Sequence, residues 1–189
     1  MRSSGPLPQG VRLHPLVMHR DPRGCLTEIF RTEWGLGLAP VQWNFVTSGA
    51  SVLRGVHVHV RHADYLILAS GRATIGLRDL RPSAASFGQV ATLEVKGDDL
   101  QALIIPPGVA HGFYFSEPAI HIYAVTEYWN EADELGCHWA DSDLAIPWPA
   151  TNTLTSPRDR NAQSFRALEA ELASVGAYDH WAQLAEASS

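Results

Sequence analysis

The pattern that most restricts the fold of this chain is a succession of short apolar runs separated by turn residues. The runs are rich in Val, Ile, Leu, Tyr and Thr, which suit a pleated, half-buried strand. Turn signals such as Ser48-Gly49, Ser70-Gly71 and Lys96-Gly97 stand between them. Short strands at this spacing predict an all-β sandwich or barrel of antiparallel strands. The runs cover residues 11–18, 41–47, 51–60, 65–70, 72–77, 89–95, 102–105 and 120–127.

The domain organisation follows from length and composition. A chain of 189 residues with 46% hydrophobic and 18% charged residues fits one globular domain with a short appendage. Residues 1–10 are rich in Ser, Gly and Pro, so we expect a mobile N-terminus before a β domain over 11–160. Near the other end, Phe165 and Leu168 begin an apolar series at helical spacing. We therefore expect a helical appendage over 161–189.

Charge and cysteine content exclude several classes of function. The formal net charge is −6, and the 14 cationic residues, of which only Lys96 is a lysine, form no basic run that would bind a nucleic acid. No window has the roughly 18 apolar residues of a membrane span, and the N-terminus lacks a signal-peptide pattern. Cys25 and Cys137 lie far apart and fit reduced thiols. We expect a cytoplasmic protein without nucleic-acid or membrane partners.

The histidines are the first candidates for chemistry. His57 and His59 are two residues apart in a predicted strand, so their side chains project from the same face and valines project from the other. If the valines pack into the barrel, the imidazoles face solvent instead. His111 follows the turn at Pro106-Pro107-Gly108, which could direct the next strand so that its imidazole meets the His57 and His59 face.

These two segments resemble the signature motifs of the cupin superfamily, a jelly-roll barrel with an internal pocket. In metal-binding cupins the equivalent residues are two histidines and an acid from the first motif and a histidine from the second. The resemblance gives His57, His59, Asp64 and His111 as a candidate ligand set. Three imidazoles and a carboxylate suit one divalent transition metal such as Fe, Mn, Ni or Zn.

A longer resemblance covers roughly residues 15–160. The chain is similar to the dTDP-4-dehydrorhamnose 3,5-epimerase family, which are metal-free cupins acting on nucleotide-linked keto sugars. The resemblance implies a cupin-type antiparallel jelly roll, no cofactor, and a homodimer that pairs or exchanges N-terminal strands. The matching elements are, in order, Asp21-Pro22-Arg23-Gly24 with Thr27-Glu28-Ile29-Phe30, Gln42-Trp43-Asn44, Leu53-Arg54-Gly55-Val56-His57, Asp79-Leu80-Arg81 with Ser86-Phe87-Gly88, the 105–113 segment, Tyr123 with 126–130, and 139–141 leading into 146–149.

The same resemblance implies catalytic roles. Epimerisation beside a ketone removes an acidic C–H proton, passes through an enolate and returns a proton to the opposite face. His57 is the implied base, and Asp141 is the implied carboxylate that fixes its tautomer. Tyr123 is the implied acid on the opposite face, because a phenol is protonated at neutral pH.

The implied substrate is a nucleoside diphosphate keto sugar, with dTDP as the expected nucleotide. Guanidinium groups suit its phosphate oxygens, and amides suit base edges and hydroxyls. An aromatic ring suits stacking on the thymine. The residues that match ligand-facing positions of the family are Arg23, Glu28, Gln42, Asn44, Arg54, His111 and Trp129.

The sequence departs from the family at one important position. The family has a lysine seven residues before the glycine at position 71, and this chain has Asp64. An acid there would oppose the charge that develops on the ketone oxygen, so a cation from Arg54, His59, His62 or a metal would have to replace the lysine.

Three hypotheses follow. The first is a 3- or 3,5-epimerase, with a 3,4-ketoisomerase as a close variant. The second is a metal-dependent cupin oxygenase or isomerase that uses His57, His59, Asp64 and His111. The third is a non-catalytic module that binds nucleotide sugars.

Overall fold

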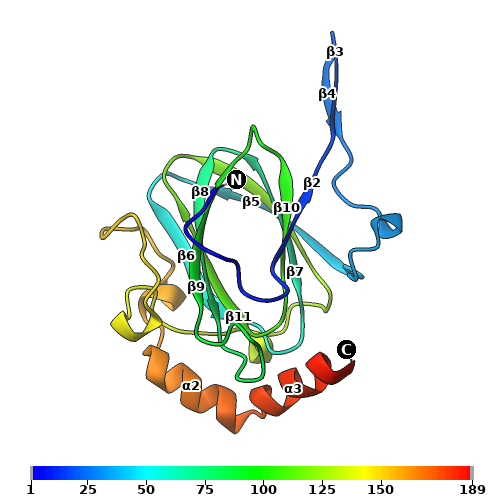
Figure 1. Ribbon diagram of the computed structural model, residues 1–189. Coiled ribbons are helices and arrows are strands. Elements are labelled where there is room, and N and C mark those ends of the chain that lie inside the picture. The colour runs from blue at the N-terminus through cyan, green and yellow to red at the C-terminus, as the bar shows by residue number, and fades with distance from the viewer. Residues whose placement is uncertain (1, 188–189) are drawn as a thin grey trace.

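The computed structural model describes residues 2–187, which form two antiparallel sheets packed face to face with helices at the C-terminus (Figure 1). One sheet has the strand order β1-β9-β8-β11-β6-β13, and the other has the order β2-β10-β7-β12-β5. This arrangement is the predicted cupin-type jelly roll. The first sheet comprises β1 (Arg2–Ser3), β6 (Val52–Val58), β8 (Arg72–Asp79), β9 (Val90–Lys96), β11 (Val109–Phe115) and β13 (Leu135–Gly136). The second comprises β2 (Arg12–Pro15), β5 (Gln42–Ser48), β7 (Asp64–Ser70), β10 (Gln101–Ile105) and β12 (Ala119–Val125).

The central strands are apolar along most of their length because both of their faces are covered. An apolar cluster between the sheets includes Leu66, Ile75 and Phe115. A second cluster covers the outer face of the first sheet, and a third, around Tyr65 and Ile67, covers the outer face of the second. Strands buried on both faces lose the strict apolar and polar alternation of a solvent-facing sheet.

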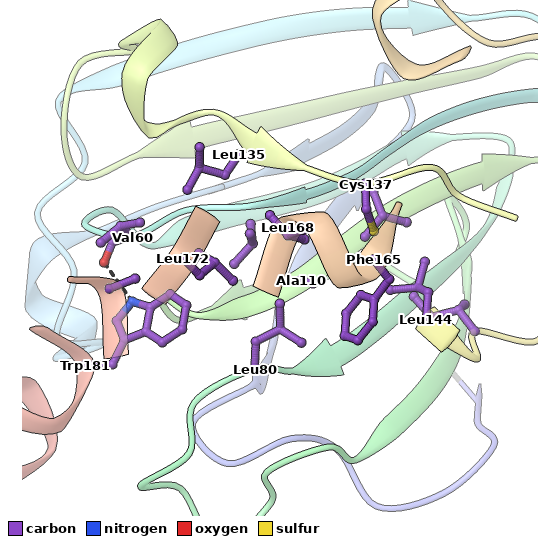
Figure 2. Close-up of a cluster of buried hydrophobic side chains, with 14 residues drawn as sticks. Val60, Leu80, Ala110, Leu135, Cys137, Leu144, Phe165, Leu168, Leu172 and Trp181 are labelled. Carbon is purple, nitrogen blue, oxygen red and sulfur yellow. Dashed lines mark hydrogen bonds between the residues drawn. The ribbon is translucent and has the colours of Figure 1, made fainter. Parts of the chain in front are cut away.

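Two C-terminal helices cover the outer face of the first sheet. The sequence predicted helical structure here, and the structure divides it into α2 (Phe165–Ser174) and α3 (Ala177–Ala187), which meet at Gly176 with a φ of 70°. Their apolar side chains pack on the outward-facing valines of β6, and the Trp181 indole donates to the Val60 carbonyl at 2.9 Å (Figure 2). Within residues 2–187, no helix is both long and apolar enough to cross a membrane.

The N-terminal segment, which we expected to be mobile, contacts the barrel. β1 pairs with β9, and the Gln9 carbonyl accepts a hydrogen bond from the Arg81 guanidinium at 2.6 Å. Shortly after, β3 (Met18–Asp21) and β4 (Gly24–Thr27) form a two-stranded hairpin. Figure 1 shows that this hairpin projects away from the barrel.

The remaining elements are short. They are the 3-10 helices η1 (Thr32–Trp34), η2 (Glu131–Asp133) and η3 (Ser142–Leu144), and the one-turn helix α1 (Pro157–Arg160). Both η2 and α1 lie next to the pocket described below.

The packing of α2 on the barrel predicts a large effect on stability. Leu168 is fully buried, whereas Val175 at the end of α2 is 54% exposed. We expect Leu168→Ala to lower the free energy of unfolding by about 2–5 kcal/mol because it leaves a cavity. The matched Val175→Ala change is expected to cost less than about 0.5 kcal/mol. Urea unfolding of both variants tests this, and similar losses for the two would contradict it.

Candidate active site

A pocket with a volume of about 310 Å³ lies between the two sheets. Its walls come from β6 and β11 of one sheet and from β5, β7 and β12 of the other. His57, His59 and His111 all line it. The valines beside His57 and His59 face outward and are covered by the C-terminal helices. The two imidazoles therefore face the pocket and not the solvent.

His57 and Asp159 form a hydrogen-bonded pair in this pocket, with His57 Nε2 2.9 Å from Asp159 Oδ1. A carboxylate accepts, so His57 donates from Nε2, and Nδ1 is the atom left to take up a proton. Asp159 lies in α1, where the Ser156 hydroxyl caps the helix by accepting from the Asp159 amide at 3.0 Å. Burial raises the pKa of Asp159, but its hydrogen bonds, chiefly that from His57, outweigh burial and leave the pKa below its usual value. The carboxylate is therefore ionised at neutral pH.

A close approach between β6 and β11 sets the position of His57. Gly55 has a φ of 112°, and a Cβ there would lie 2.8 Å from the Gly112 Cα and 2.9 Å from the His111 carbonyl oxygen. No other residue fits this contact. The strand pairing shifts register between His111 and Gly112, and the Gly55 amide lies 3.5 Å from Asp159 Oδ2. The glycine therefore places the base and its carboxylate partner together.

The prediction that Asp141 is the partner of His57 is wrong. The Asp141 carboxylate accepts from the Asp143 amide and from the Phe165 amide, each at 2.9 Å. It caps η3 and supports the start of α2, outside the pocket. Asp141 is thus a structural residue, and Asp159, which is 102 positions from His57 in the chain, takes the expected place.

Tyr123 lines the same pocket from β12, in the sheet opposite His57. Burial raises the pKa of its phenol, and the carboxylates of Glu134 and Asp64 raise it further. The phenol is therefore protonated at neutral pH. A base on one sheet and a proton donor on the other can act on two faces of a bound molecule.

His59, Asp64 and His111 lie together in the pocket and are each less than 7% exposed. Burial, aided by the neighbouring histidines, lowers the pKa of His59, and burial lowers that of His111 to about 4. Burial raises the pKa of Asp64 to about 7. The expected four-residue metal set is not one cluster. Among the described residues, the ligand atoms that lie within 4.8 Å of one another belong to His59, His62 and Asp64, and His57 is engaged with Asp159.

Four of the seven expected substrate-binding residues line the pocket, namely His111, described above, and Gln42, Arg54 and Trp129. The Arg54 guanidinium is held by the Ser48 hydroxyl at 3.0 Å, and the Gln42 side chain accepts from the Trp129 backbone amide at 2.9 Å. Trp129 is 54% exposed at the pocket wall. Asn44 is beside Gln42, whose amide donates to it at 3.1 Å, but it does not line the pocket.

The other two expected binding residues lie away from the pocket of their own chain. Arg23 is at the turn of the β3–β4 hairpin, where it pairs with Asp21 at 2.6 Å. Glu28 follows β4 and pairs with Arg31 at 2.9 Å. Neither residue lines this pocket.

The sequence reasoning missed several pocket residues. Arg158 and Asp159 had one usable signal, since Ser156-Pro157 is typical of a helix start and would have directed attention to the residues after it. His121 and Glu134 had none, because each stands alone in an ordinary segment. The sequence predicts His62 only as a replacement cation for the lysine.

Comparison with known proteins identifies the family. The dTDP-4-dehydrorhamnose 3,5-epimerase family matches residues 7–167. The chain belongs to this family. The dTDP-4-dehydrorhamnose 3,5-epimerase of Escherichia coli K12 is 34% identical over 149 residues, covering 74% of this chain and 80% of that protein. The dTDP-4-dehydrorhamnose 3-epimerase of Streptomyces niveus is 30% identical over 151 residues, covering 75% of this chain and 73% of that protein.

A solved relative has the same fold and a sugar nucleotide bound. The 3,5-epimerase RmlC of Legionella pneumophila, in complex with dTDP-4-keto-L-rhamnose, superposes with a TM-score of 0.78 at 31% identity. The match covers 86% of this chain and 92% of that one. These relatives favour the epimerase hypothesis over an oxygenase or a non-catalytic module. The protein is an epimerase-type isomerase of a nucleotide sugar.

The different positions of Asp159 and Asp141 predict different effects when each is replaced by Asn. We expect Asp159→Asn to lower the epimerisation rate about 100- to 10,000-fold, because His57 loses the carboxylate that fixes its tautomer. Asp141→Asn is expected to keep the rate and to lower the free energy of unfolding by about 1 kcal/mol, through a weakened hydrogen bond to the Phe165 amide. Steady-state kinetics and urea unfolding measure both. A slow Asp141→Asn enzyme with a fast Asp159→Asn enzyme would reverse the assignment.

Proposed function

We propose that this pocket inverts C3, C5 or both in a dTDP-linked 4-keto-6-deoxyhexose. The observation that carries the proposal is the His57–Asp159 pair at 2.9 Å in a pocket that has Tyr123 on its opposite wall. Relatives that invert one centre and relatives that invert two are similarly close in sequence, so the proposal covers both outcomes.

The reaction proceeds by two proton transfers. His57 takes the proton from the carbon beside the ketone, and the electron pair of that C–H bond forms the enolate. Asp159 stabilises the resulting imidazolium, since its carboxylate accepts from the other ring nitrogen. Tyr123 then donates its phenolic proton to the opposite face of the same carbon. Both transfers use protein groups, so no organic or redox cofactor takes part.

Arginines and an aromatic ring hold the nucleotide. Arg54 and Arg158 line the pocket and are its guanidinium groups, which suit the diphosphate oxygens. The exposed ring of Trp129 offers a surface on which the thymine stacks. Binding energy from these remote groups keeps the keto sugar against His57.

Arg23 and Glu28 complete the site of a second copy. They lie on or beside a hairpin that extends away from its own barrel, and Arg23 is at its tip with a side chain that is 90% exposed. A homodimer related by a two-fold axis would carry each hairpin to the pocket of the other protomer. The fit of an Arg to the diphosphate supports this arrangement.

Tyr123→Phe separates the two proton transfers. In deuterated water with dTDP-4-keto-6-deoxyglucose, the unmodified protein should place deuterium at C3, C5 or both and form the inverted product. We expect the variant to keep His57-dependent deuterium incorporation while inversion falls about 100-fold, because the opposite-face donor is gone. Mass spectrometry and NMR of the sugar follow both. Absence of exchange with any nucleotide keto sugar would refute the proposed function.

The shared site predicts complementation between two inactive variants. Arg23→Ala and His57→Asn homodimers should each be impaired. After mixing under conditions that exchange protomers, half of the dimers are hybrids, and each hybrid has one site with both native residues. We expect recovery to about a quarter of the native rate. If mixing restores nothing although exchange is verified, Arg23 does not act across the dimer.

A further inference from the structure

Three polar side chains, His59, His62 and Asp64, form a tight cluster in the pocket outside the His57–Asp159 pair. One ring nitrogen from each histidine and one carboxylate oxygen of Asp64 all lie within 4.8 Å of one another. The three side chains are at least 92% buried, and all line the pocket. The proton transfers of the proposed mechanism use none of them.

Asp133 fixes the orientation of both histidines. Its carboxylate Oδ2 lies 3.0 Å from His62 Nδ1, and its backbone carbonyl lies 3.3 Å from His59 Nδ1. Its other carboxylate oxygen accepts from the Val60 amide at 2.8 Å. Because these oxygens only accept, both imidazoles carry a proton on Nδ1, and in their neutral forms both have a lone pair on Nε2. Histidines that ligate metals are held in this way.

Among the described residues, no donor or acceptor lies within hydrogen-bond range of the Nε2 atoms of His59 and His62. His62 Nε2 is buried and has no hydrogen-bond partner among the described residues. His59 Nε2 lies 3.6 Å from Asp64 Oδ2, which is too long for a hydrogen bond. His111 Nε2 lies 3.6 Å from the same Asp64 oxygen. The other ring nitrogen of His111, Nδ1, donates to the Val109 carbonyl at 3.0 Å. Electron-rich atoms therefore converge on Asp64.

A bound cation accounts for this arrangement better than a proton does. A proton on Asp64 can be donated to the Nε2 lone pair of either His59 or His111, which leaves the lone pair of the other imidazole without a donor. A proton on His62 Nε2 finds no acceptor among the described residues. The carboxylates of Asp64, Asp133 and Glu134 bring acidic groups together, and among the described residues Glu134 alone of the three pairs with an arginine, Arg158 at 3.1 Å.

We propose that His59, His62 and Asp64 bind one divalent transition-metal ion, with His111 beside it. Two imidazoles and a carboxylate suit Zn²⁺, Ni²⁺, Co²⁺ or Fe²⁺, and a set of three protein ligands leaves coordination positions free. The ligands differ from those that the cupin resemblance implied, because His57 belongs to the catalytic pair and His62 takes its place.

The role of this ion rests on the proposed function. Asp64 occupies the position where the family has a lysine, and the developing enolate needs positive charge on its oxygen. A divalent ion held by Asp64 in the same pocket supplies that charge. The replacement of lysine by Asp64 then substitutes a bound divalent ion for the ammonium group, so the pocket keeps a positive charge.

Cobalt binding to the intact chain tests the site without any substrate. After treatment with a chelator and its removal, Co²⁺ is titrated while calorimetry and the visible absorption of the ion are followed. We expect one ion per chain and an absorption band typical of mixed nitrogen and oxygen ligands. Asp64→Asn and His62→Gln should each weaken binding at least tenfold, and Asp133→Asn should weaken it about 10- to 100-fold by releasing the histidines.

The matched control is His121→Gln, which changes a buried pocket histidine outside the cluster and should leave Co²⁺ affinity unchanged. No stoichiometric binding, or binding that Asp64→Asn and His62→Gln both leave intact, would overturn the proposal. Because the readout needs no keto sugar, a protein that binds Co²⁺ as expected but never exchanges a sugar proton would refute the function and retain the metal site.

Discussion

The contact between β6 and β11 at Gly55 is the constraint on which the site depends. Two backbones meet where no Cβ fits, and the pairing shifts register beside His111. This local irregularity turns the Gly55 amide toward Asp159 and places His57 within hydrogen-bond distance of the same carboxylate. A regular ladder with a larger residue would move the base away from its partner, so the chemistry depends on a position that has no side chain.

The barrel interior has two chemically different regions. Between the sheets, one region is filled by apolar side chains such as Ile75 and Leu103, which stabilise the fold. The neighbouring region holds buried histidines and carboxylates, whose pKa values are displaced in opposite directions by burial. Buried polar groups of this kind cost stability unless they are paired, and Asp133 and Asp159 provide much of the pairing. The apolar region and the C-terminal helices offset that cost.

The helices and the hairpin have separate functions on the outside of the barrel. The helices cover the valines of β6 and so force His57 and His59 inward, which a bare sheet would not do. The hairpin extends away from the barrel and carries Arg23 with it. One chain therefore builds the base, its carboxylate and the proton donor, and the proposed dimer adds the remaining phosphate contact.

The sequence by itself determined the jelly roll, the family and part of the pocket lining, because turn residues, strand composition and collinear motifs are local properties. It identified His57 and Tyr123 as pocket residues but selected Asp141 instead of Asp159, and it did not group His62 with Asp64. Only the tertiary structure decided these partners. The packing of strands and loops brings the carboxylate to the imidazole, and a separation of 102 positions in the chain leaves no periodicity from which that contact can be read.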